Sequence, residues 1–376
     1  MMTTRILRWS TAHGVVLLAL GACGLSSAVA QDKPQYELGD VKVPAAKADE
    51  PIRGALSLEK AVEHLEAGTK AWSGVRKCIS CHTNGTYMQI RPALSAHFGP
   101  PAADQREFYV AQLQTFKAME RKQLKQSTRP AQVIYLAAGL AEWDAHVSKQ
   151  LSAETKEALA LMFEIQLDSG AWGTLDCWPP FESDAYHEAT VAAMAAGTAP
   201  GWLAGVEDEK TKAGVEKLKQ YLRTTPPLHD YSRVLLLWAS TRMPGLLEAE
   251  QTKQLQDVVF QHQRPDGGWS IRTFAKPEAW GSGGRAAKLR SEPEFENPPS
   301  DGHQTGLAIL VLRASGVDAQ DARIQKGVTW IKANQRESGR WWTRSLNTDS
   351  WHFISYSGTA YPVLALAACN EIPAKQ

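Results

Sequence analysis

The chain has 376 residues, a formal net charge of +1 at pH 7 and 22% charged residues. Because the positive and negative charges nearly cancel, there is no electrostatic basis for general binding to nucleic acid or to an anionic membrane. Five cysteines in a chain of this length do not form a disulfide framework of the kind that small secreted domains use.

The first 30 residues have the pattern of a secretory signal peptide. Arg5 and Arg8 form a short basic region, an apolar run too short to span a bilayer follows, and residues 28–30 are a small-residue cleavage site. A second pattern, Leu-Gly-Ala-Cys ending at Cys23, resembles a bacterial lipobox and would make Cys23 a lipid anchor. We therefore expect a periplasmic or otherwise exported protein, with lipid attachment at Cys23 left open, followed by a linker over 31–54.

A CxxCH pentapeptide is formed by Cys78, Cys81 and His82. Two thiols at this spacing can add to the two vinyl groups of a haem, and the imidazole that follows can bind the iron. The residues before it, 58–72, have the spacing of an amphipathic helix. The sequence therefore predicts covalently attached haem c in a helical segment over 55–105, with Cys78 and Cys81 as the attachment points and His82 as a metal ligand.

Other uses of the CxxC pair are a redox disulfide, half of a metal site, or an inert structural element. A thioredoxin-like disulfide needs a βαβ context, and zinc needs two more ligands nearby; neither is evident in the sequence. Candidates for a second, distal iron ligand are Met88, His97 and Met119, and a five-coordinate iron is the alternative to all three. Basic side chains near the motif (Arg76, Lys77 and Arg91) could pair with haem propionates or be solvated surface charge.

Three segments share the pattern QxxxGxW, over 166–172, 263–269 and 335–341, and each follows a helical pattern. The glycine permits a turn that ends the helix, the tryptophan can fold back across that end, and the glutamine amide can bond backbone groups left without helical partners. We expect such units to tie together the outer helices of an α/α barrel.

Segments that are apolar nearly all round predict buried inner helices, whereas the charged segments between them predict an outer ring. The inner segments are 133–140, 189–196, 234–240, 305–312 and 359–368, and the outer ones include 207–222 and 247–261. Residues 276–299, rich in glycine, proline and charge, read as a long loop over the mouth of the barrel. The predicted fold class is all-α: an incomplete or single α/α toroid over 106–376, preceded by the haem-binding segment.

With these motifs the chain resembles the α/α-toroid superfamily of squalene-hopene cyclases and protein prenyltransferases, and it is similar to exported bacterial relatives of those cyclases that carry CxxCH. The resemblance covers roughly residues 128–369 and implies the fold more than any reaction. Class II cyclases use an acidic DxDD element, which this chain lacks; the comparable stretch around Asp184 offers only Glu188 beside His187. The resemblance therefore does not imply cyclase chemistry here, and no Asp–Cys pair suits the zinc site of the prenyltransferases.

Polar side chains stand where three predicted inner helices begin, and in a toroid these positions converge on one mouth of the central cavity. They are Asp184, His187, Glu188, Asp301, His303 and Tyr356. One interpretation is a polar catalytic site with two imidazoles and a carboxylate. The other is ordinary helix capping by the two aspartates, with the histidines hydrogen-bonded nearby. The sequence leaves both open.

Two functions of different classes follow. The first is an exported haem protein on a toroid frame that transfers electrons to a redox partner or oxidises a bound molecule. The second is a protein that binds a small apolar, isoprenoid-like molecule in the barrel, without the DxDD acid. Covalent haem needs little beyond the motif itself, so the sequence favours the first.

Overall fold

The computed structural model describes residues 33–176, 178–181 and 184–375. The predicted signal peptide over 1–30 and the predicted lipid anchor at Cys23 lie outside the described residues. Residues Lys33–Gln376 form one compact unit. The predicted division at 105/106 therefore does not separate two compact bodies; the CxxCH segment is part of the toroid itself.

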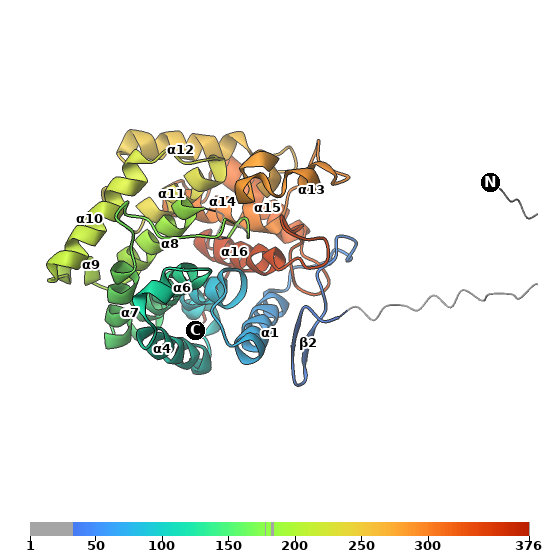
Figure 1. Ribbon diagram of the computed structural model, residues 1–376. Helices are drawn as coiled ribbons and strands as arrows, with labels where there is room; N and C mark the ends of the chain where they lie inside the picture. The colour runs from blue at the N-terminus through green and yellow to red at the C-terminus, as the bar shows by residue number, and fades with distance from the viewer. Residues whose placement is uncertain (1–32, 177, 182–183, 376) are drawn as a thin grey trace, which may run out of the picture. The chain divides into compact units, whose positions relative to one another are not determined.

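Outer helices surround an inner ring of helices (Figure 1). Within the described residues, six helices form this closed inner ring. They are α2 (Thr86–Ile90), α6 (Arg129–Trp143), α8 (Ala185–Thr198), α11 (Asp230–Ser240), α14 (Gly302–Ala314) and α16 (Ile354–Ala368). Each packs against the next in this order, and α16 packs against α2, which closes the ring. The fold class is thus an all-α toroid, as predicted, and the single-barrel form of that prediction is the one observed.

An outer helix precedes each inner helix along the chain. The outer helices are α1 (Leu58–Arg76), α4 (Ala103–Lys117), α7 (Ala153–Glu164), α10 (Glu209–Thr224), α12 (Ala249–Gln261) and α15 (Ala322–Ala333). In α10, only a stripe at 214, 215, 218 and 222 is buried, whereas α8 is buried nearly all round. This contrast follows from the sequence, because a helix with one apolar stripe can face water and a helix without a polar face cannot.

Shorter elements connect the ring. They are η1 (Cys81–Gly85), η2 (Pro92–Leu94), α3 (Ser95–Phe98), α5 (Arg121–Leu124), η3 (Asp144–Ser148), α9 (Trp202–Gly205), η4 (Ile271–Thr273), η5 (Pro277–Ala279), η6 (Gly281–Gly283) and α13 (Ala286–Arg290). The predicted loop over 276–299 thus contains η5, η6 and α13. It covers the mouth of the barrel as expected, because buried Trp280 lies on the rings of His229 and Tyr231, with centroids 4.7 and 5.5 Å away.

The three QxxxGxW segments share one geometry. Each tryptophan indole donates to a carbonyl in the last turn of the preceding outer helix: Trp172 to Met162, Trp269 to Val259 and Trp341 to Ile331. Each glycine has φ between 88° and 91°, a conformation that suits only glycine without strain. The glutamine amides donate to the carbonyl of that glycine and to the next outer helix.

The last of these segments closes the ring between the two ends of the chain. Gln335 donates to the carbonyl of Ser57 at 2.8 Å and accepts from its amide at 2.7 Å. Ser57 is the N-cap of α1, so the amide group joins the end of α15 to the start of α1. The barrel is thereby held shut by side-chain hydrogen bonds between Gln335 and the backbone of Ser57, whose carbonyl also accepts the first helical bond of α1, from the amide of Ala61.

The segment predicted as a linker, 31–54, is folded in its described part. Strands β1 (Tyr36–Leu38) and β2 (Val41–Val43) form an antiparallel hairpin that packs on α1. Buried Arg340 donates to the carbonyl of Pro44 and pairs with Glu50 at 3.1 Å. This corrects the expectation of a linker: two short strands of three residues each carry too little pattern to be recognised before their packing partners are known.

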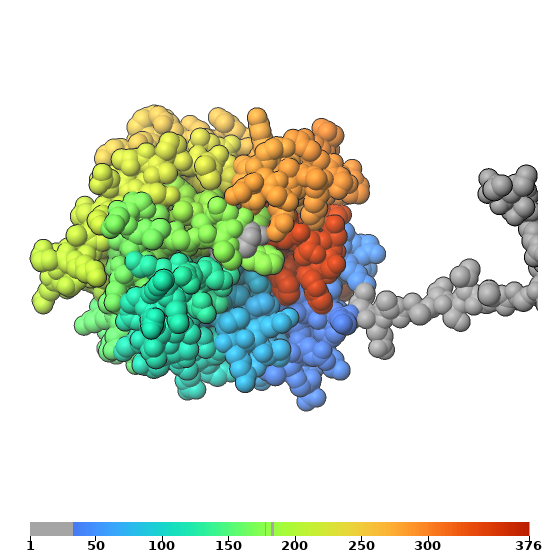
Figure 2. Space-filling model, viewed as in Figure 1, coloured from blue at the N-terminus to red at the C-terminus, as the bar shows by residue number. Residues whose placement is uncertain are grey.

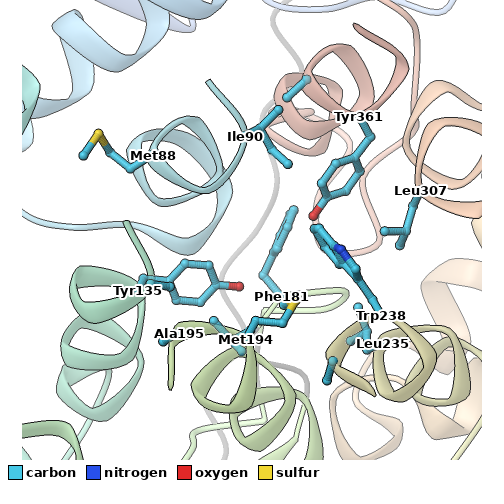
Figure 3. Packing of buried hydrophobic residues seen from close by; sticks show 14 of the residues in the cluster. Met88, Ile90, Tyr135, Phe181, Met194, Ala195, Leu235, Trp238, Leu307 and Tyr361 are labelled. Carbon is cyan, nitrogen blue, oxygen red and sulfur yellow. The ribbon is translucent and has the colours of Figure 1, made fainter. Parts of the chain in front are cut away.

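The centre of the barrel is filled by its own side chains. Figure 3 shows Tyr135, Phe181, Trp238 and Tyr361 converging from different elements, and all four are at most 5% exposed. Aromatic residues of this size occupy the space that a ligand would otherwise take. None of the helices in the described part of the chain has the length and apolar character needed to cross a membrane.

Candidate functional site

A cavity of about 400 Å³ lies at the mouth of the barrel. Both thiols of the CxxCH motif, Cys78 and Cys81, line it together with the imidazole of His82. Its aromatic lining residues are Trp72, Trp178, Phe181, Trp351 and Phe353, and its polar ones include Thr128, Gln132, Ser345, Asn347 and Thr348. Segments from the blue, green and red parts of the chain meet on this side of the molecule (Figure 2). A hydrogen bond from Asn347 to the carbonyl of Pro179 at 2.7 Å joins the green and red segments.

Local hydrogen bonds fix the CxxCH loop. The Asn84 side chain, fully buried, accepts from the amide of Ser80 at 2.8 Å and donates to the carbonyl of Cys78 at 3.0 Å. Gly85 follows because a Cβ there would lie 2.4 Å from the Ser80 oxygen and 2.8 Å from the Tyr135 ring. The residues after the motif thus hold the backbone that carries the two thiols. Asn-Gly is a turn signal in the sequence, but here both residues belong to the helical turn η1.

His82 is held as a neutral imidazole. Its ring stacks on Phe353 at a centroid distance of 4.8 Å and meets Trp72 edge-on at 4.6 Å. Burial lowers the pKa of His82 to about 4, so the ring is uncharged near neutral pH, the state in which imidazole binds metals. Nδ1 is hydrogen-bonded to the Thr83 hydroxyl at 2.7 Å.

Cys78 and Cys81 form no disulfide with each other, and both are partly buried. Burial raises the pKa of Cys78. Within the described ranges of the chain, no three His, Cys, Asp or Glu side chains converge to hold a metal ion. A haem iron needs only one or two protein ligands, so a haem site is of a different kind from those clusters.

The three predicted distal ligands lie elsewhere in the structure. Met88 is fully buried and points away from Phe181 and Tyr361 (Figure 3). His97 contacts the carbonyl of Pro373 at 3.1 Å, and Met119 follows α4, partly buried against the core. None of the three is among the residues that line the cavity, so the identity of a distal ligand stays a prediction.

Of the basic side chains near the motif, Arg91 is engaged in another pair. Its guanidinium binds Glu66 at 2.9 Å and the carbonyl of Gly99 at 2.8 Å. Arg76 lies over the ring of Trp72, 5.7 Å from its centroid. Arg91 is thereby removed from the candidates for propionate binding, whereas Arg76 stands beside the cavity wall.

Both aspartates at the inner-helix starts are helix caps, as one of the two interpretations predicts. Asp184 accepts from the amide of His187 at 2.8 Å. Asp301 accepts from the amides of Gln304 at 2.9 Å and Ile271 at 2.7 Å. Burial raises the pKa of Asp301 to about 6. Carboxylates occupied by backbone amides in this way serve to satisfy the first turn of a helix.

The two predicted histidines lie in the barrel interior, each bonded to a tyrosine. Tyr135 Oη and His187 Nε2 are 3.1 Å apart, and Tyr231 Oη and His303 Nε2 are also 3.1 Å apart. The Ser357 hydroxyl lies 2.9 Å from the carbonyl of Ile354 and 2.7 Å from His303 Nδ1. When Ser357 donates to that carbonyl, His303 carries its proton on Nδ1 and the Tyr231 hydroxyl donates to Nε2.

The remaining predicted residues, Glu188 and Tyr356, have different surroundings. Glu188 is fully buried near Tyr135, whose pKa its charge raises further. Tyr356 is directed elsewhere, because its hydroxyl donates to the carbonyl of Leu65 at 2.6 Å. The sequence analysis missed His229, which caps α11 as the aspartates cap their helices and lies 3.7 Å from Asp184. Its place before an apolar helix was a usable signal.

Phe181 separates the cavity from this polar cluster. Its ring lines the cavity on one side and meets the ring of His303 edge-on at 5.7 Å on the other. The site thus has two layers: an accessible cavity with thiols and imidazole at the mouth, and an enclosed tyrosine–histidine network beneath it.

No protein-family model matches the chain, and no curated protein matches it. Among solved structures, it is similar to a glycosidase variant in complex with glucose, with a TM-score of 0.47 and 12% identity over 84% of this chain and 98% of that one. The wild-type glycosidase gives a TM-score of 0.46 and 11% identity over 84% and 98%. The type II terpene cyclase MstE from Scytonema gives 0.42 and 11% over 82% and 99%. These likenesses are of fold only.

Proposed function

We propose that this protein is an exported c-type haem protein built on a cyclase-like toroid, with haem attached at Cys78 and Cys81 and bound through His82. One observation carries the proposal: the two thiols and the imidazole line a single cavity of about 400 Å³. That volume falls within the range of about 300–1,000 Å³ typical of small-molecule and cofactor sites. When bound, haem supplies one-electron redox chemistry.

The residues around the cavity suit this cofactor. The thiols would form the thioether links, and neutral His82 would bind the iron through Nε2, because Nδ1 is engaged with Thr83. Aromatic side chains such as Trp351 and Phe353 offer flat apolar walls, and the network beneath Phe181 shields the barrel interior. Covalent attachment of this kind takes place outside the bacterial cytoplasm, so export belongs to the proposal.

The test is expression of the full chain, with its leader, in a secreting host that has working cytochrome maturation. A Soret band, a c-type pyridine haemochrome spectrum and an intact mass raised by one haem are expected. The Cys78→Ser/Cys81→Ser double variant should lose all three. Cys369→Ser is the matched control, because Cys369 is a buried free thiol that does not line the cavity. A colourless wild-type protein with the mass of the bare polypeptide would overturn the proposal.

A second candidate is an apolar, isoprenoid-like ligand protein. The toroid fold, taken alone, agrees better with this candidate than with a haem protein, since nothing in the ring of helices itself calls for haem. Because Tyr361, Trp238 and their neighbours fill the barrel centre (Figure 3), such a ligand would occupy the mouth cavity with its aromatic walls. Without a DxDD element, binding is proposed and cyclisation is not.

Tryptophan fluorescence separates the two candidates. Trp72, Trp178 and Trp351 line the cavity, so a farnesyl-chain alcohol bound there should change the emission of the Cys78→Ser/Cys81→Ser variant. Saturable binding at micromolar concentration that is lost in Phe353→Asp would support the ligand protein. A flat titration would remove this candidate.

A further inference from the structure

A chain of buried hydrogen bonds lies behind His82, on the side away from the nitrogen that would bind iron. His82 Nδ1 is 2.7 Å from the Thr83 hydroxyl, and that hydroxyl is 3.2 Å from the hydroxyl of Tyr36. Thr83 has no exposed surface and Tyr36 is 3% exposed. Hydrogen bonds in such surroundings are stronger than in water and polarise one another.

Tyr36 is fixed by contacts on several sides. It belongs to β1, where it pairs with Val43 in the hairpin. Its ring packs against Phe353 at 5.8 Å and against Tyr356 at 5.9 Å. Phe353 also stacks on the His82 ring, so the same aromatic side chain holds the imidazole and the far end of the hydrogen-bond chain.

The single hydroxyl hydrogen of Thr83 allows two proton arrangements. In one, Tyr36 donates to Thr83 and Thr83 donates to Nδ1, which leaves the imidazole proton on Nε2. In the other, Nδ1 carries the proton and donates to the Thr83 hydroxyl. Thr83 then donates its own hydrogen to the Tyr36 hydroxyl, which is the other polar contact of the Thr83 side chain recorded in the described residues. Only the second arrangement leaves a lone pair on Nε2.

We propose that Thr83 and Tyr36 are positioning residues that fix the tautomer of His82 and set how strongly its Nε2 donates to haem iron. The inference rests on the proposed function, since it concerns the same imidazole. An acceptor on Nδ1–H fixes the ring orientation and raises the basicity of a metal-binding histidine. Tyr36 strengthens the effect, because a Thr83 hydroxyl that donates to Tyr36 becomes a better acceptor.

The consequence is a definite direction for the redox potential. A more electron-rich imidazole stabilises ferric over ferrous iron, so removal of the acceptor on Nδ1 raises the midpoint potential. Thr83→Val deletes the acceptor at nearly constant volume. Thr83→Ser keeps it, and Tyr36→Phe removes only the outer hydroxyl of the chain.

The experiment measures the midpoint potential of the haem-loaded full chain in each variant. The expected order is Thr83→Val highest, Tyr36→Phe intermediate, and Thr83→Ser close to wild type. Thr190→Val is the matched control. Thr190, like Thr83, is fully buried, but its hydroxyl donates to the carbonyl of His187 and has no recorded bond to His82. The midpoint potential of this variant should equal that of the wild type.

The outcomes separate this inference from the proposed function. Haem-bearing Thr83→Val and Tyr36→Phe with wild-type potentials would overturn the inference and leave the haem assignment intact. A wild-type chain without haem would remove both. If Thr83→Val does not fold, Tyr36→Phe against Thr83→Ser still decides, since a shift confined to Tyr36→Phe supports the chain and equal potentials in the two contradict it.

Discussion

Asn84 is predicted to be the residue on which the CxxCH loop most depends. Its side chain, without exposed surface, accepts from the amide and hydroxyl of Ser80 at 2.8 and 3.2 Å and donates to Ser73 and to the carbonyl of Cys78 at 3.1 and 3.0 Å. Each such bond contributes about 0.5–1.5 kcal/mol net. Asn84→Ala should therefore lower the free energy of unfolding by about 2–6 kcal/mol.

Asn334→Ala is the matched control. Asn334 makes one side-chain hydrogen bond, to the carbonyl of Trp330 at 2.8 Å, so its loss should cost about 1 kcal/mol. Urea unfolding of the two variants, expressed without haem and followed by circular dichroism, gives both values. Equal losses in the two variants would refute the reasoning, because the cost would then not follow the number of buried hydrogen bonds.

Two further predictions concern the closed ring and the buried histidines. Gln335→Ala removes the side-chain bonds to the amide and the carbonyl of Ser57, while the carbonyl keeps its bond from the amide of Ala61. The free energy of unfolding should fall by about 2–4 kcal/mol in urea melts. Gln263→Ala should cost less, because the recorded bonds of the Gln263 side chain are two donated to carbonyls; a larger loss for Gln263→Ala would contradict the ring-closing role. Burial lowers the pKa of His303 to about 3 and that of His187 to about 4. Unfolding therefore takes up protons below about pH 6.5, and the free energy of unfolding should fall as the pH drops toward 4. For His303 alone the loss at pH 5 is about 2 kcal/mol. Asp301, with its pKa raised to about 6, acts in the opposite direction over the same window. If the urea concentration at the unfolding midpoint is higher at pH 5 than at pH 7, the histidines do not dominate the pH dependence of stability.

The barrel could be predicted from the sequence because its signals are local. Segments such as 189–196 and 305–312 are apolar on every side, and each became the core of an inner helix, α8 and α14. The glycines of the QxxxGxW segments marked the helix ends, where all three adopt a left-handed backbone conformation. Helix period and turn chemistry require no knowledge of distant residues.

The candidate site was predicted only in part. CxxCH named Cys78, Cys81 and His82 because the motif is contiguous, but the sequence could not place Phe353 or Trp351 beside them, since those residues are more than 250 positions further along the chain. It also placed Tyr356 with the polar cluster on the strength of its position at a helix start. The structure turns that hydroxyl toward Leu65 instead, because the side-chain direction on a helix depends on its packing against neighbours.

By itself, the sequence determined that this chain is an all-α toroid with a CxxCH motif, since helical period, glycine turns and a five-residue motif are properties of short stretches. Only the tertiary structure decided that the CxxCH segment belongs to the ring, that its thiols and imidazole share one cavity with residues from the other end of the chain, and that Tyr36 stands behind His82 through Thr83. The physical reason is that closure of the ring brings α16 against α2 and α1, and a cavity exists only where such distant segments meet.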